Sequence, residues 1–516
     1  MPDEDALDRI DRFERFLVTR PDLALRVCCP SQEFTREEMS HGVGRWFSGA
    51  RGLWESLTVA REPGLAVVML QAPPVPDPVV DHLLGLRPGD ESAIADRRRR
   101  HLLVGIDDDS EVHLSEKLLA RPHLLDRLRA LVTAARERGQ RVDRLSGYQS
   151  STRMDAVAAA LGLEQRETPS ATLKWGTKAG SRQLFASAGV PHPPGTYRVS
   201  RDLADLAGHA ADLCRRHGPG RWLLKINEGF GTGHGNALVT VDRADADAVL
   251  RDWEQNLVPM VKNTSRADFL GHVAAQGAIL ERFREPARGG EVRAPSTLFF
   301  VEPSSGGADI RLLGTHDQVM GGELDFTGGR FPADAAYRQP IIDLSRSVVE
   351  ELVEVGVRGH VGIDFLARRA DRGRWDLDAL EINLRQTGTT HPNRTVRALV
   401  TGTWHADGTL THRGSPVCYE STDGLVDPSY RAITPDALIA GLTASPDLRF
   451  DPDRAQGVVP HLWTALRPFG KIGATFIGGS GPDCGALREG FVDLLAELAE
   501  SSRVKAAGTG FRGDLA

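Results

Sequence analysis

Lysine is scarce in this chain. Of its 516 residues 63 are basic, but only seven are lysine and the other 56 are arginine. A GC-rich genome accounts for most of this bias. A lysine that stands at a chemically sensible position therefore carries more information than usual.

Cysteine and long apolar runs are also rare. The five cysteines form no CxxC pair, and an odd, scattered set indicates reduced thiols rather than a disulfide framework. The acidic start, Met1 to Asp5, lacks the positive region and apolar core of a signal peptide. No apolar run approaches the roughly 18 residues needed to cross a bilayer. We expect a cytoplasmic protein without a membrane partner.

Excess positive charge is missing as well. The net charge of −7 gives no electrostatic footprint for nucleic acid. The basic run Arg97–Arg100 has no aromatic neighbours, which favours a solvated face over a polyanion site. With 41% hydrophobic and 26% charged residues, the composition is that of a globular protein and excludes a disordered or fibrous chain. Its length corresponds to two to four domains.

The first third of the chain predicts an α/β domain. Residues 1–60 read as helical and polar, with an amphipathic stretch at 5–18. Residues 65–72 and 101–107 read as buried strands, and 123–139 as a helix that ends at Gly139. This alternation predicts a parallel-sheet domain over about 60–172.

The rest of the chain predicts two further domains. A helix at 178–188 opens a strand-rich α+β region, with further helices at 241–257 and 340–356 and another after His391-Pro392-Asn393. The predicted strands are 222–227, 236–242, 278–283, 296–302, 311–318, 359–368 and 375–385. A hairpin, strands at 458–466 and 472–478, a turn at 478–485 and a helix at 485–498 follow. We therefore place domains at 1–172, 173–400 and 401–516.

A glycine-rich loop joins two of these strands. Its glycines are Gly229, Gly231, Gly233 and Gly235. A strand follows the loop, which excludes the P-loop and the dinucleotide fingerprint because both need a helix there. The backbone N–H groups of such a hairpin can close over a triphosphate, and a tight turn without a ligand is the alternative. Lys225 in the entering strand favours the phosphate site, since a buried lysine needs an anionic partner.

A second group of polar residues lies on two strands farther along. Asp364 precedes Glu381 by seventeen residues, and a turn signal at 371–373 predicts a hairpin that brings the two strands together. Alternation places Glu381, Asn383 and Arg385 on one face. Two carboxylates and an amide are hard ligands that suit Mg²⁺, and Arg385 could grip a terminal phosphate. A solvated polar sheet face is the alternative.

Taken in order, these motifs resemble the ATP-grasp superfamily of carboxylate–amine ligases. The resemblance covers about 173–400 and rests on Lys178, Lys225, Glu281-Arg282-Phe283, Asp364 and Glu381-x-Asn383-x-Arg385. Residues 312–322, 380–392 and about 440–500 resemble the pheganomycin-type peptide ligases in particular. The resemblance implies a mixed α/β and α+β fold. An N-terminal parallel-sheet domain would precede an ATP-grasp core, whose two α+β subdomains clasp the nucleotide, and a small C-terminal domain would follow.

The resemblance also implies roles for individual residues. Lys178 and Lys225 would contact the ATP phosphates, with Lys225 also on the adenine side. The backbone at Arg282-Phe283 would read the adenine edge beside Glu281, and Glu291 is a candidate for the ribose, although which acid contacts the ribose stays open. Asp364, Glu381 and Asn383 would hold one or two Mg²⁺ ions, with Mn²⁺ as a substitute. Arg385 would stabilise the transferring γ-phosphoryl group.

The loop after the last of these strands is expected to face the substrate. Thr389, Thr390 and His391 stand before a helix and could bind a carboxylate there. His316 is a candidate contact for the phosphate or the acyl intermediate. A helix cap at His391 and a structural hydrogen bond at His316 are the alternatives. No GxSxG motif supports a serine triad.

We predict an ATP-dependent ligase that activates a carboxylate as an acyl phosphate and couples it to an amine. Its partners would be an amino-acid-like carboxylate and an amino-acid or peptide amine, in natural-product biosynthesis. A phosphotransferase with the same cleft and a nucleotide-binding regulatory module are the alternatives. The sequence names neither substrate and leaves open the number of metal ions, a homo-oligomer and the role of the C-terminal domain.

Overall fold

A computed structural model describes residues 4–34, 51–228, 235–260, 264–285, 290–320, 326–370 and 373–509. Its contacts divide the chain into two compact units. Unit 1 comprises Met1–Ser170, Gly328–Phe331 and Arg385–Ala516, and unit 2 comprises Ala171–Thr327 and Pro332–Leu384. The N-terminal segment and the C-terminal segment of the chain thus share unit 1. The three-domain division stays a prediction.

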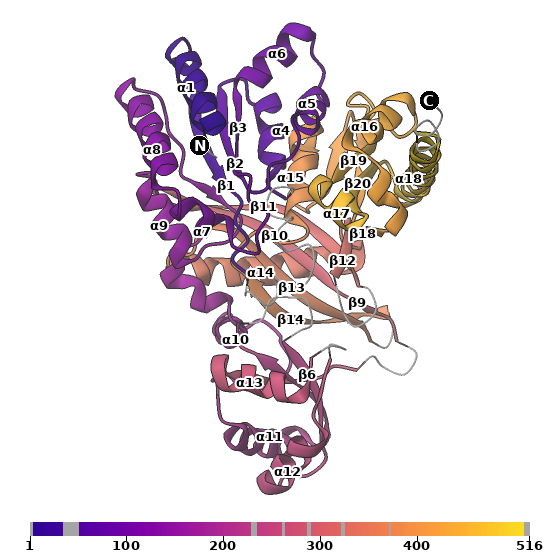
Figure 1. Cartoon of the computed structure of the whole chain (residues 1–516). Helices are drawn as coiled ribbons and strands as arrows, with labels where there is room; N and C mark the ends of the chain where they lie inside the picture. Colours follow the sequence, from indigo (N-terminus) through magenta and orange to yellow (C-terminus); the bar gives the residue numbers. More distant parts are fainter. Residues whose placement is uncertain are drawn as a thin grey trace, which may run out of the picture. The chain divides into compact units, whose positions relative to one another are not determined.

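The N-terminal part of unit 1 contains a four-stranded sheet in the order β3-β2-β1-β4, and all its pairs are parallel. The expected parallel sheet is therefore present, and Figure 1 shows its strands between helices. The strands are β1 (Ala24–Cys29), β2 (Leu65–Gln71), β3 (His101–Gly105) and β4 (Ser146–Gly147). The helices are α1 (Glu4–Val18), α4 (Trp54–Arg61), α5 (Asp77–Gly85), α6 (Glu91–Arg99), α7 (Leu114–Leu119), α8 (Pro122–Glu137) and α9 (Thr152–Ala160).

Alternating side chains of this sheet enter two different cores. Leu25 and Val27 of β1 pack with α1, α7, α8 and α9, while Ala24 and Cys28 pack with α4 and α5. Strand β1 lies inside the stretch that the sequence predicted to be helical, so that prediction was wrong. All six of its residues are buried, and a strand buried on both faces shows no alternation of polar and apolar residues.

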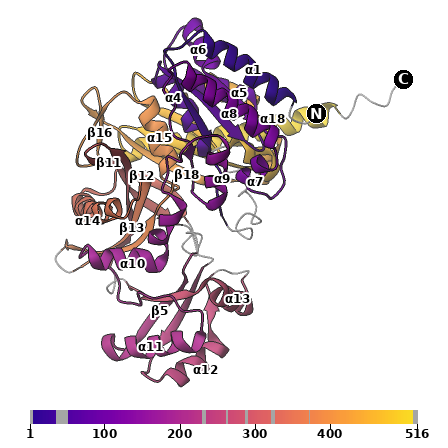
Figure 2. The ribbon, with the colours of Figure 1, turned by 90° about the vertical axis from the view of Figure 1, so that its left-hand side faces the viewer.

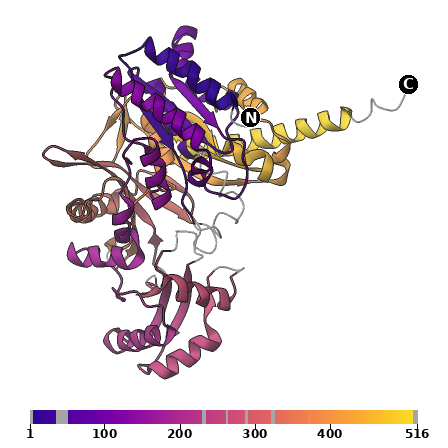
Figure 3. The same ribbon diagram turned by 60° about the vertical axis from the view of Figure 1, so that its left-hand side comes forward.

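The core that contains α4 and α5 extends into the C-terminal part of the chain. It includes Val396, Phe476 and Leu495 together with the residues of α4 and α5. The strands here are β15 (Thr403–Trp404), β16 (Leu410–His412), β17 (Ser415–Pro416), β18 (Cys418–Val426), β19 (Gly457–His461) and β20 (Lys471–Gly478). The helices are α15 (Thr390–Leu399), α16 (Pro435–Ala444), α17 (Leu466–Phe469) and the long α18 (Gly481–Thr509), which is yellow in Figure 3.

Three predictions about this part need correction. The strand predicted at 458–466 ends at His461, because Leu462 adopts a left-handed conformation, with φ of 60°, that breaks the strand. The turn predicted at 478–485 gives way to α18 at Gly481. Helix α15 begins at Thr390, before the expected start. Pro392 fits its first turn because the N–H groups there have no partner within the helix.

The arginine run is only partly a solvated face. Arg97 and Arg100 are buried and donate to backbone carbonyls, including those of Leu84 and Val59. Arg98 and Arg99 line a surface cleft, described below. Arg97 and Arg100 therefore bind the end of α6 to neighbouring segments of the backbone.

Unit 2 begins with an antiparallel sheet in the order β7-β6-β5-β8. The strands are β5 (Gly220–Ile226), β6 (Asn236–Val241), β7 (Val258–Pro259) and β8 (Ala278–Arg282), and the helices are α11 (Leu203–His217), α12 (Ala246–Asn256) and α13 (Arg266–Gln276). Figure 2 shows α11 and α12 side by side. Their apolar faces pack on Trp222 and Leu224 of β5.

The other part of unit 2 is an antiparallel sheet in the order β14-β13-β10-β11, and the short β9 pairs with β13. The strands are β9 (Val292–Arg293), β10 (Pro295–Ser304), β11 (Gly307–Met320), β13 (Gly359–Arg369) and β14 (Trp375–Asn383). Helices α10 (Lys178–Ser187) and α14 (Ala335–Glu354) share a core with this sheet. The chain passes from unit 2 to unit 1 within β12 (Phe326–Phe331), which pairs with β18 in unit 1.

All five cysteines are free thiols, as expected. Among the described residues, no helix combines the length and the hydropathy that crossing a membrane requires.

Candidate functional site

The predicted hairpin of acidic strands is present in unit 2. Strands β13 and β14 are antiparallel, with Asp364 opposite Glu381 and Gly362 opposite Asn383. The Asn383 amide donates to Oδ2 of Asp364 at 2.8 Å, and the Gln318 amide donates to Oδ1 at 2.7 Å. The opposite face is apolar, since Ile382 is fully buried. Oxygen-bearing side chains thus converge at one end of the hairpin.

Lys178 reaches the same group of side chains. Its Nζ lies 2.5 Å from Oε2 of Glu381. Lys178 is the first residue of α10, whose N-cap Thr177 accepts from the N–H of Gly180. Its own N–H donates to the carbonyl of Asn227, which follows β5. One helix start therefore connects the acidic hairpin to the β5 strand.

Lys225 forms a buried ion cluster at β5. Its Nζ donates to Oε1 of Glu281 at 2.6 Å, and Arg182 of α10 donates to Oε2 at 3.1 Å. All three residues are buried. Two cations share one carboxylate, so the cluster carries a net positive charge that favours an incoming anion.

The segment predicted to read adenine is bound tightly to its neighbours. The N–H of Arg282 donates to the carbonyl of Pro194, and the N–H of Phe283 donates to that of Arg221. The Arg282 guanidinium donates to two further carbonyls, at Gly218 and Pro219. These two N–H groups are therefore already engaged, and contact of the Arg282-Phe283 backbone with adenine stays a prediction.

Glu291 lies next to β9 and pairs with two arginines. Its side chain contacts Arg293, and its second oxygen is 3.3 Å from Arg369. Glu281 is buried, whereas the Glu291 side chain is about one-third exposed. Glu291 is thus accessible to a ligand, and its role at the ribose stays a prediction.

His316 lies in β11 and is fully buried. Burial lowers its pKa to about 3, so the ring is neutral at physiological pH. A neutral ring can donate one hydrogen bond to a phosphate but cannot neutralise its charge. Its contact with the phosphate or the acyl intermediate stays a prediction.

The glycine loop is only partly described. Gly229, Gly231 and Gly233 lie outside the described residues. Gly235 precedes β6, and its carbonyl accepts from the N–H of Ile226 at 2.7 Å. The two strands that flank the loop are thus antiparallel neighbours, as predicted.

The remaining predicted site residues belong to unit 1. Arg385 lies two residues beyond the end of β14, so strand alternation does not set its direction. Thr389 occupies the N-cap position of α15, and Thr390 accepts from the N–H of Thr387 at 2.8 Å. His391 is buried, and neither ring nitrogen has a hydrogen-bond partner. The histidine therefore does not cap its helix.

Sequence reasoning missed several supporting residues. Arg182, Asn227 and Gln318 bond directly to predicted site residues or to their backbone. Arg182 follows Lys178 by four positions and therefore lies on the same helix face, which is a signal that the sequence does contain. Gln318 carries no such signal, because only strand pairing brings it to Asp364.

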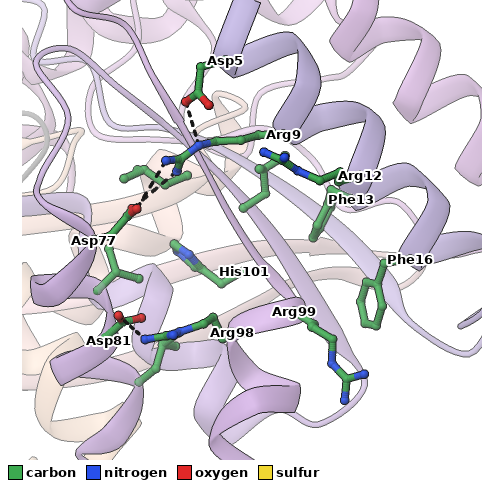
Figure 4. A pocket seen from close by; sticks show the side chains of 14 residues that line it. Asp5, Arg9, Arg12, Phe13, Phe16, Asp77, Asp81, Arg98, Arg99 and His101 are labelled. Atoms are coloured by element: carbon green, nitrogen blue, oxygen red, sulfur yellow. Dashed lines mark hydrogen bonds and ion pairs between the residues drawn. The ribbon is translucent and has the colours of Figure 1, made fainter.

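A cleft of about 500 Å³ in unit 1 involves none of the predicted residues. Figure 4 shows two of its arginines, Arg9 and Arg98, reaching toward nearby carboxylates. Arg9 pairs with Asp5 at 2.9 Å and Asp77 at 3.3 Å, and Arg98 pairs with Asp81. None of the residues that line this cleft has a buried polar side-chain atom without a hydrogen-bond partner, and we assign the cleft no ligand.

The sequence of this chain is similar to one family model and to two known proteins described here. A family model described as IQCH-like, ATP-grasp matches residues 169–265. The chain is 31% identical over 477 residues to an L-propargylglycine–L-glutamate ligase of Streptantibioticus cattleyicolor, covering 92% of this chain and 94% of that protein. It is 25% identical over 329 residues to the IQ motif-containing protein H of Danio rerio, covering 55% of this chain and 30% of that protein.

Solved structures with similar backbones include an N5-carboxyaminoimidazole ribonucleotide synthetase from Thermus thermophilus. The TM-score is 0.49 at 14% identity, and the match covers 92% of this chain and 98% of that one. The family follows from the sequence match along nearly the whole chain. This protein belongs to the ATP-grasp carboxylate–amine ligases and is an ATP-dependent ligase that forms an amide bond.

Proposed function

We propose that this ligase joins two amino acids, activating the carboxylate of one as an acyl phosphate and coupling it to the amine of the other. The observation that carries this proposal is the convergence of Asp364, Glu381 and Asn383 with Lys178. The relative that matches along 92% of the chain is named for two amino acids, L-propargylglycine and L-glutamate, which supports amino-acid substrates. Propargylglycine is not a protein constituent, and this fits a role in natural-product biosynthesis.

The acidic hairpin fits magnesium. Asp364 and Glu381 supply carboxylate oxygens and Asn383 an amide oxygen, which are the hard donors that Mg²⁺ prefers. Few protein oxygens are needed, because the nucleotide phosphates complete the coordination. When bound, the ion would neutralise charge on the transferring phosphoryl group. Gln318 orients the Asp364 carboxylate through its hydrogen bond.

The lysines fit the nucleotide phosphates. Lys178 lies on α10 and Lys225 on β5. Each lysine pairs with a carboxylate at a distance of 2.6 Å or less. An ammonium paired in this way is positioned to bind phosphate as a point charge. Arg182 compensates Glu281 when Lys225 turns to the phosphates. Arg385, which follows the hairpin in the chain, would bind the γ-phosphoryl group.

The reaction then needs no protein nucleophile. A carboxylate oxygen of the donor attacks the γ-phosphorus, and the bond to the β,γ-bridging oxygen breaks to release ADP. The neutral amine nitrogen of the acceptor attacks the carbonyl carbon, the carbon–oxygen bond to phosphate breaks, and the proton lost from the nitrogen leaves to solvent. Positioning and charge neutralisation supply the rate enhancement.

Hydroxylamine tests this sequence of steps. The protein is incubated with Mg·ATP, hydroxylamine and each of a panel of L-amino acids that includes L-propargylglycine. We expect a hydroxamate together with equimolar ADP and phosphate, because hydroxylamine intercepts the acyl phosphate. A phosphorylated product without free phosphate would establish the phosphotransferase instead. ATP binding without any turnover would establish the regulatory module.

A further inference from the structure

Unpartnered polar atoms gather at one end of the parallel sheet in unit 1. Gln32 follows β1 and Gln149 follows β4, and these strands are parallel neighbours with Cys29 opposite Gly147. Gln32 is 2% exposed, yet both atoms of its amide lack a hydrogen-bond partner, as does Oε1 of Gln149. An unmet buried amide is costly, so each such group calls for a ligand or a structural reason.

The carboxyl ends of β1 and β4 form a topological switch point of the sheet, and the space outside them is here named the crevice. Helix α4 follows β1 and packs in one core, whereas α9 follows β4 and packs in the other. These two helices therefore lie on opposite faces of the sheet. In open parallel sheets, ligands bind outside the carboxyl ends of the strands at such a switch point.

An ion pair and two histidines lie close to the crevice. The Arg51 side chain bonds to Tyr148, the residue before Gln149, and also pairs with Asp423 of β18. Nε2 of His461 is 2.7 Å from Oδ1 of Asp423, and the His391 ring lies 4.3 Å from that of His461. Nδ1 of His461 and both nitrogens of His391 have no hydrogen-bond partner.

The crevice also adjoins the segment that follows the acidic hairpin. Gln386, the residue after Arg385, donates through its backbone N–H to the carbonyl of Tyr148. Its side-chain amide donates to the carbonyl of Gly147 at 2.8 Å. The end of β4 is thus bonded directly to the chain next to a predicted catalytic arginine.

We propose that this crevice binds the amino acid that supplies the amine, with Arg51 contacting its carboxylate and Asp423 its ammonium group. This inference rests on the proposed function. Arg51 and Asp423 carry the two opposite charges of an α-amino acid, and their existing ion pair keeps both neutralised before the substrate arrives. Gln32 and Gln149 at the ends of β1 and β4, and His391 beside His461, supply polar atoms without a hydrogen-bond partner.

A metal ion is a weaker occupant. His391, Asp423 and His461 could offer three ligand atoms, all within 4.8 Å of one another. Arg51, however, contacts the Asp423 carboxylate, and its positive charge opposes a second cation there. Lys471 adds a further positive charge to this cluster; burial lowers its pKa, Asp423 raises it and Arg51 lowers it. A zwitterion adds no net charge to the cluster.

Steady-state kinetics on Gln32→Leu and Gln149→Leu test the proposal. The substrates are the pair of L-amino acids that gives the highest rate of ADP release with the wild type. We expect the KM of the amine-supplying amino acid to rise about tenfold in each variant, and on the order of a hundredfold in Arg51→Gln. The KM of ATP stays within twofold. Arg9→Gln, which removes a charge elsewhere in unit 1, leaves both constants unchanged.

Two further measurements separate a substrate site from a purely structural role of these amides. Hydroxamate formation replaces the amine by hydroxylamine, so the variants should keep the wild-type rate in that assay. The melting temperatures of both leucine variants should equal or exceed that of the wild type. The reason is that each replaced amide is buried and has at least one polar atom without a hydrogen-bond partner.

Three results would overturn the proposal. The first is an unchanged KM of the amine-supplying amino acid in both leucine variants. The second is a loss of hydroxamate formation in these variants that equals their loss of amide formation. The third is Zn²⁺ that the wild-type protein retains through gel filtration and the His391→Asn variant does not. A wild-type protein that forms neither hydroxamate nor amide would contradict the ligase function itself, which keeps the two failures distinct.

Discussion

At the scale of single residues, two of the rare lysines are the ones that we propose for the nucleotide phosphates. Lys178 and Lys225 both have a carboxylate as partner, Glu381 and Glu281 respectively. Lysine suits this task because a compact ammonium can exchange a carboxylate for a phosphate, whereas the larger guanidinium of arginine favours a fixed bidentate pair. Arg182, which also donates to the backbone carbonyls of Pro193 and Thr196, is the fixed member of the set.

The metal-site residues give the first prediction. Glu381→Gln keeps the shape of the side chain but removes its charge, so we expect kcat to fall on the order of 100- to 1,000-fold. Asn383→Ala should have a comparable effect, and chelation of divalent ions should abolish turnover. The measurement is ADP release at saturating Mg²⁺.

Glu302→Gln is the matched control, because Glu302 of β10 has a partly exposed side chain that pairs with Arg311. Its turnover should equal that of the wild type. If Glu381→Gln kept the wild-type turnover and melting temperature, Glu381 would not be a ligand of the catalytic metal ion.

At the scale of elements, the start of α10 connects the acidic hairpin to β5. Its first turn carries Lys178, and Asn227 accepts from the N–H of Lys178 and the N–H of Ala179. Gly180 lies in the same turn, where an added Cβ would come within 2.0 Å of the carbonyl oxygen of Lys174. Close backbone packing, rather than a special backbone angle, is the reason for glycine there.

Gly180→Ala should displace that turn. We expect the free energy of unfolding to fall by roughly 1–3 kcal/mol and the KM of ATP to rise, because Lys178 moves with the helix. The matched variant is Gly208→Ala in α11, where no atom lies within 4 Å of the added methyl. It should raise stability by about 1 kcal/mol. Denaturant titration and ATP kinetics on both variants check this, and equal stabilities would refute the packing argument.

At the scale of the whole molecule, the N-terminal and C-terminal segments share a core. Helix α4 packs on α15, and α5 packs on α16. Arg87, which follows α5, donates to the carbonyl of Ala398 at 2.8 Å. These segments are separated by about 300 residues in the sequence, so their association depends on the complete fold.

A chain that ends at residue 400 tests this association. We expect it to lose cooperative unfolding and to bind hydrophobic dyes, because the faces of α4 and α5 that contact the C-terminal segment become exposed. Thermal denaturation and dye fluorescence are the measurements. A soluble truncated protein with wild-type unfolding would favour the three independent domains predicted from the sequence.

Three buried or half-buried histidines predict a loss of stability in acid. Burial lowers the pKa of His82 and of His101 to about 4, and that of His316 to about 3. In the unfolded chain a histidine titrates near 6.5, so between these values the unfolded state binds more protons. The contribution of these histidines to the free energy of unfolding is therefore at its maximum above about pH 6.5, and it decreases as the pH drops toward 4.

His82→Leu isolates one of these contributions. Nε2 of His82 has no hydrogen-bond partner, so no such bond is lost at that atom. The variant should reduce the slope of unfolding free energy against pH by about 1.4 kcal/mol per pH unit between pH 6.5 and 4.5. Denaturant titrations at pH 7, 6 and 5 measure the slope. A slope identical to that of the wild type would mean that His82 is charged in the folded protein.

Much of the local structure could be predicted from the sequence. The strands at 65–71, 101–105 and 220–226, the helices at 4–18 and 178–187 and the hairpin that pairs Asp364 with Glu381 follow from apolar periodicity and turn residues, which act over a few positions. Strand β1 was missed because a strand buried on both faces has no such periodicity. Arg385 was placed on the hairpin face, but β14 ends before it.

By itself the sequence determined the elements and the order of chemically competent residues, including the two lysines and the acidic hairpin. Only the tertiary structure brought Gln318 to Asp364, Arg182 to Glu281 and Arg51 to Asp423, which are 46, 99 and 372 residues apart. It also placed Gln32 and Gln149 at the same end of the parallel sheet. The reason is physical: periodicity reports which face of an element is buried, whereas the partner of that face is set by packing among distant segments.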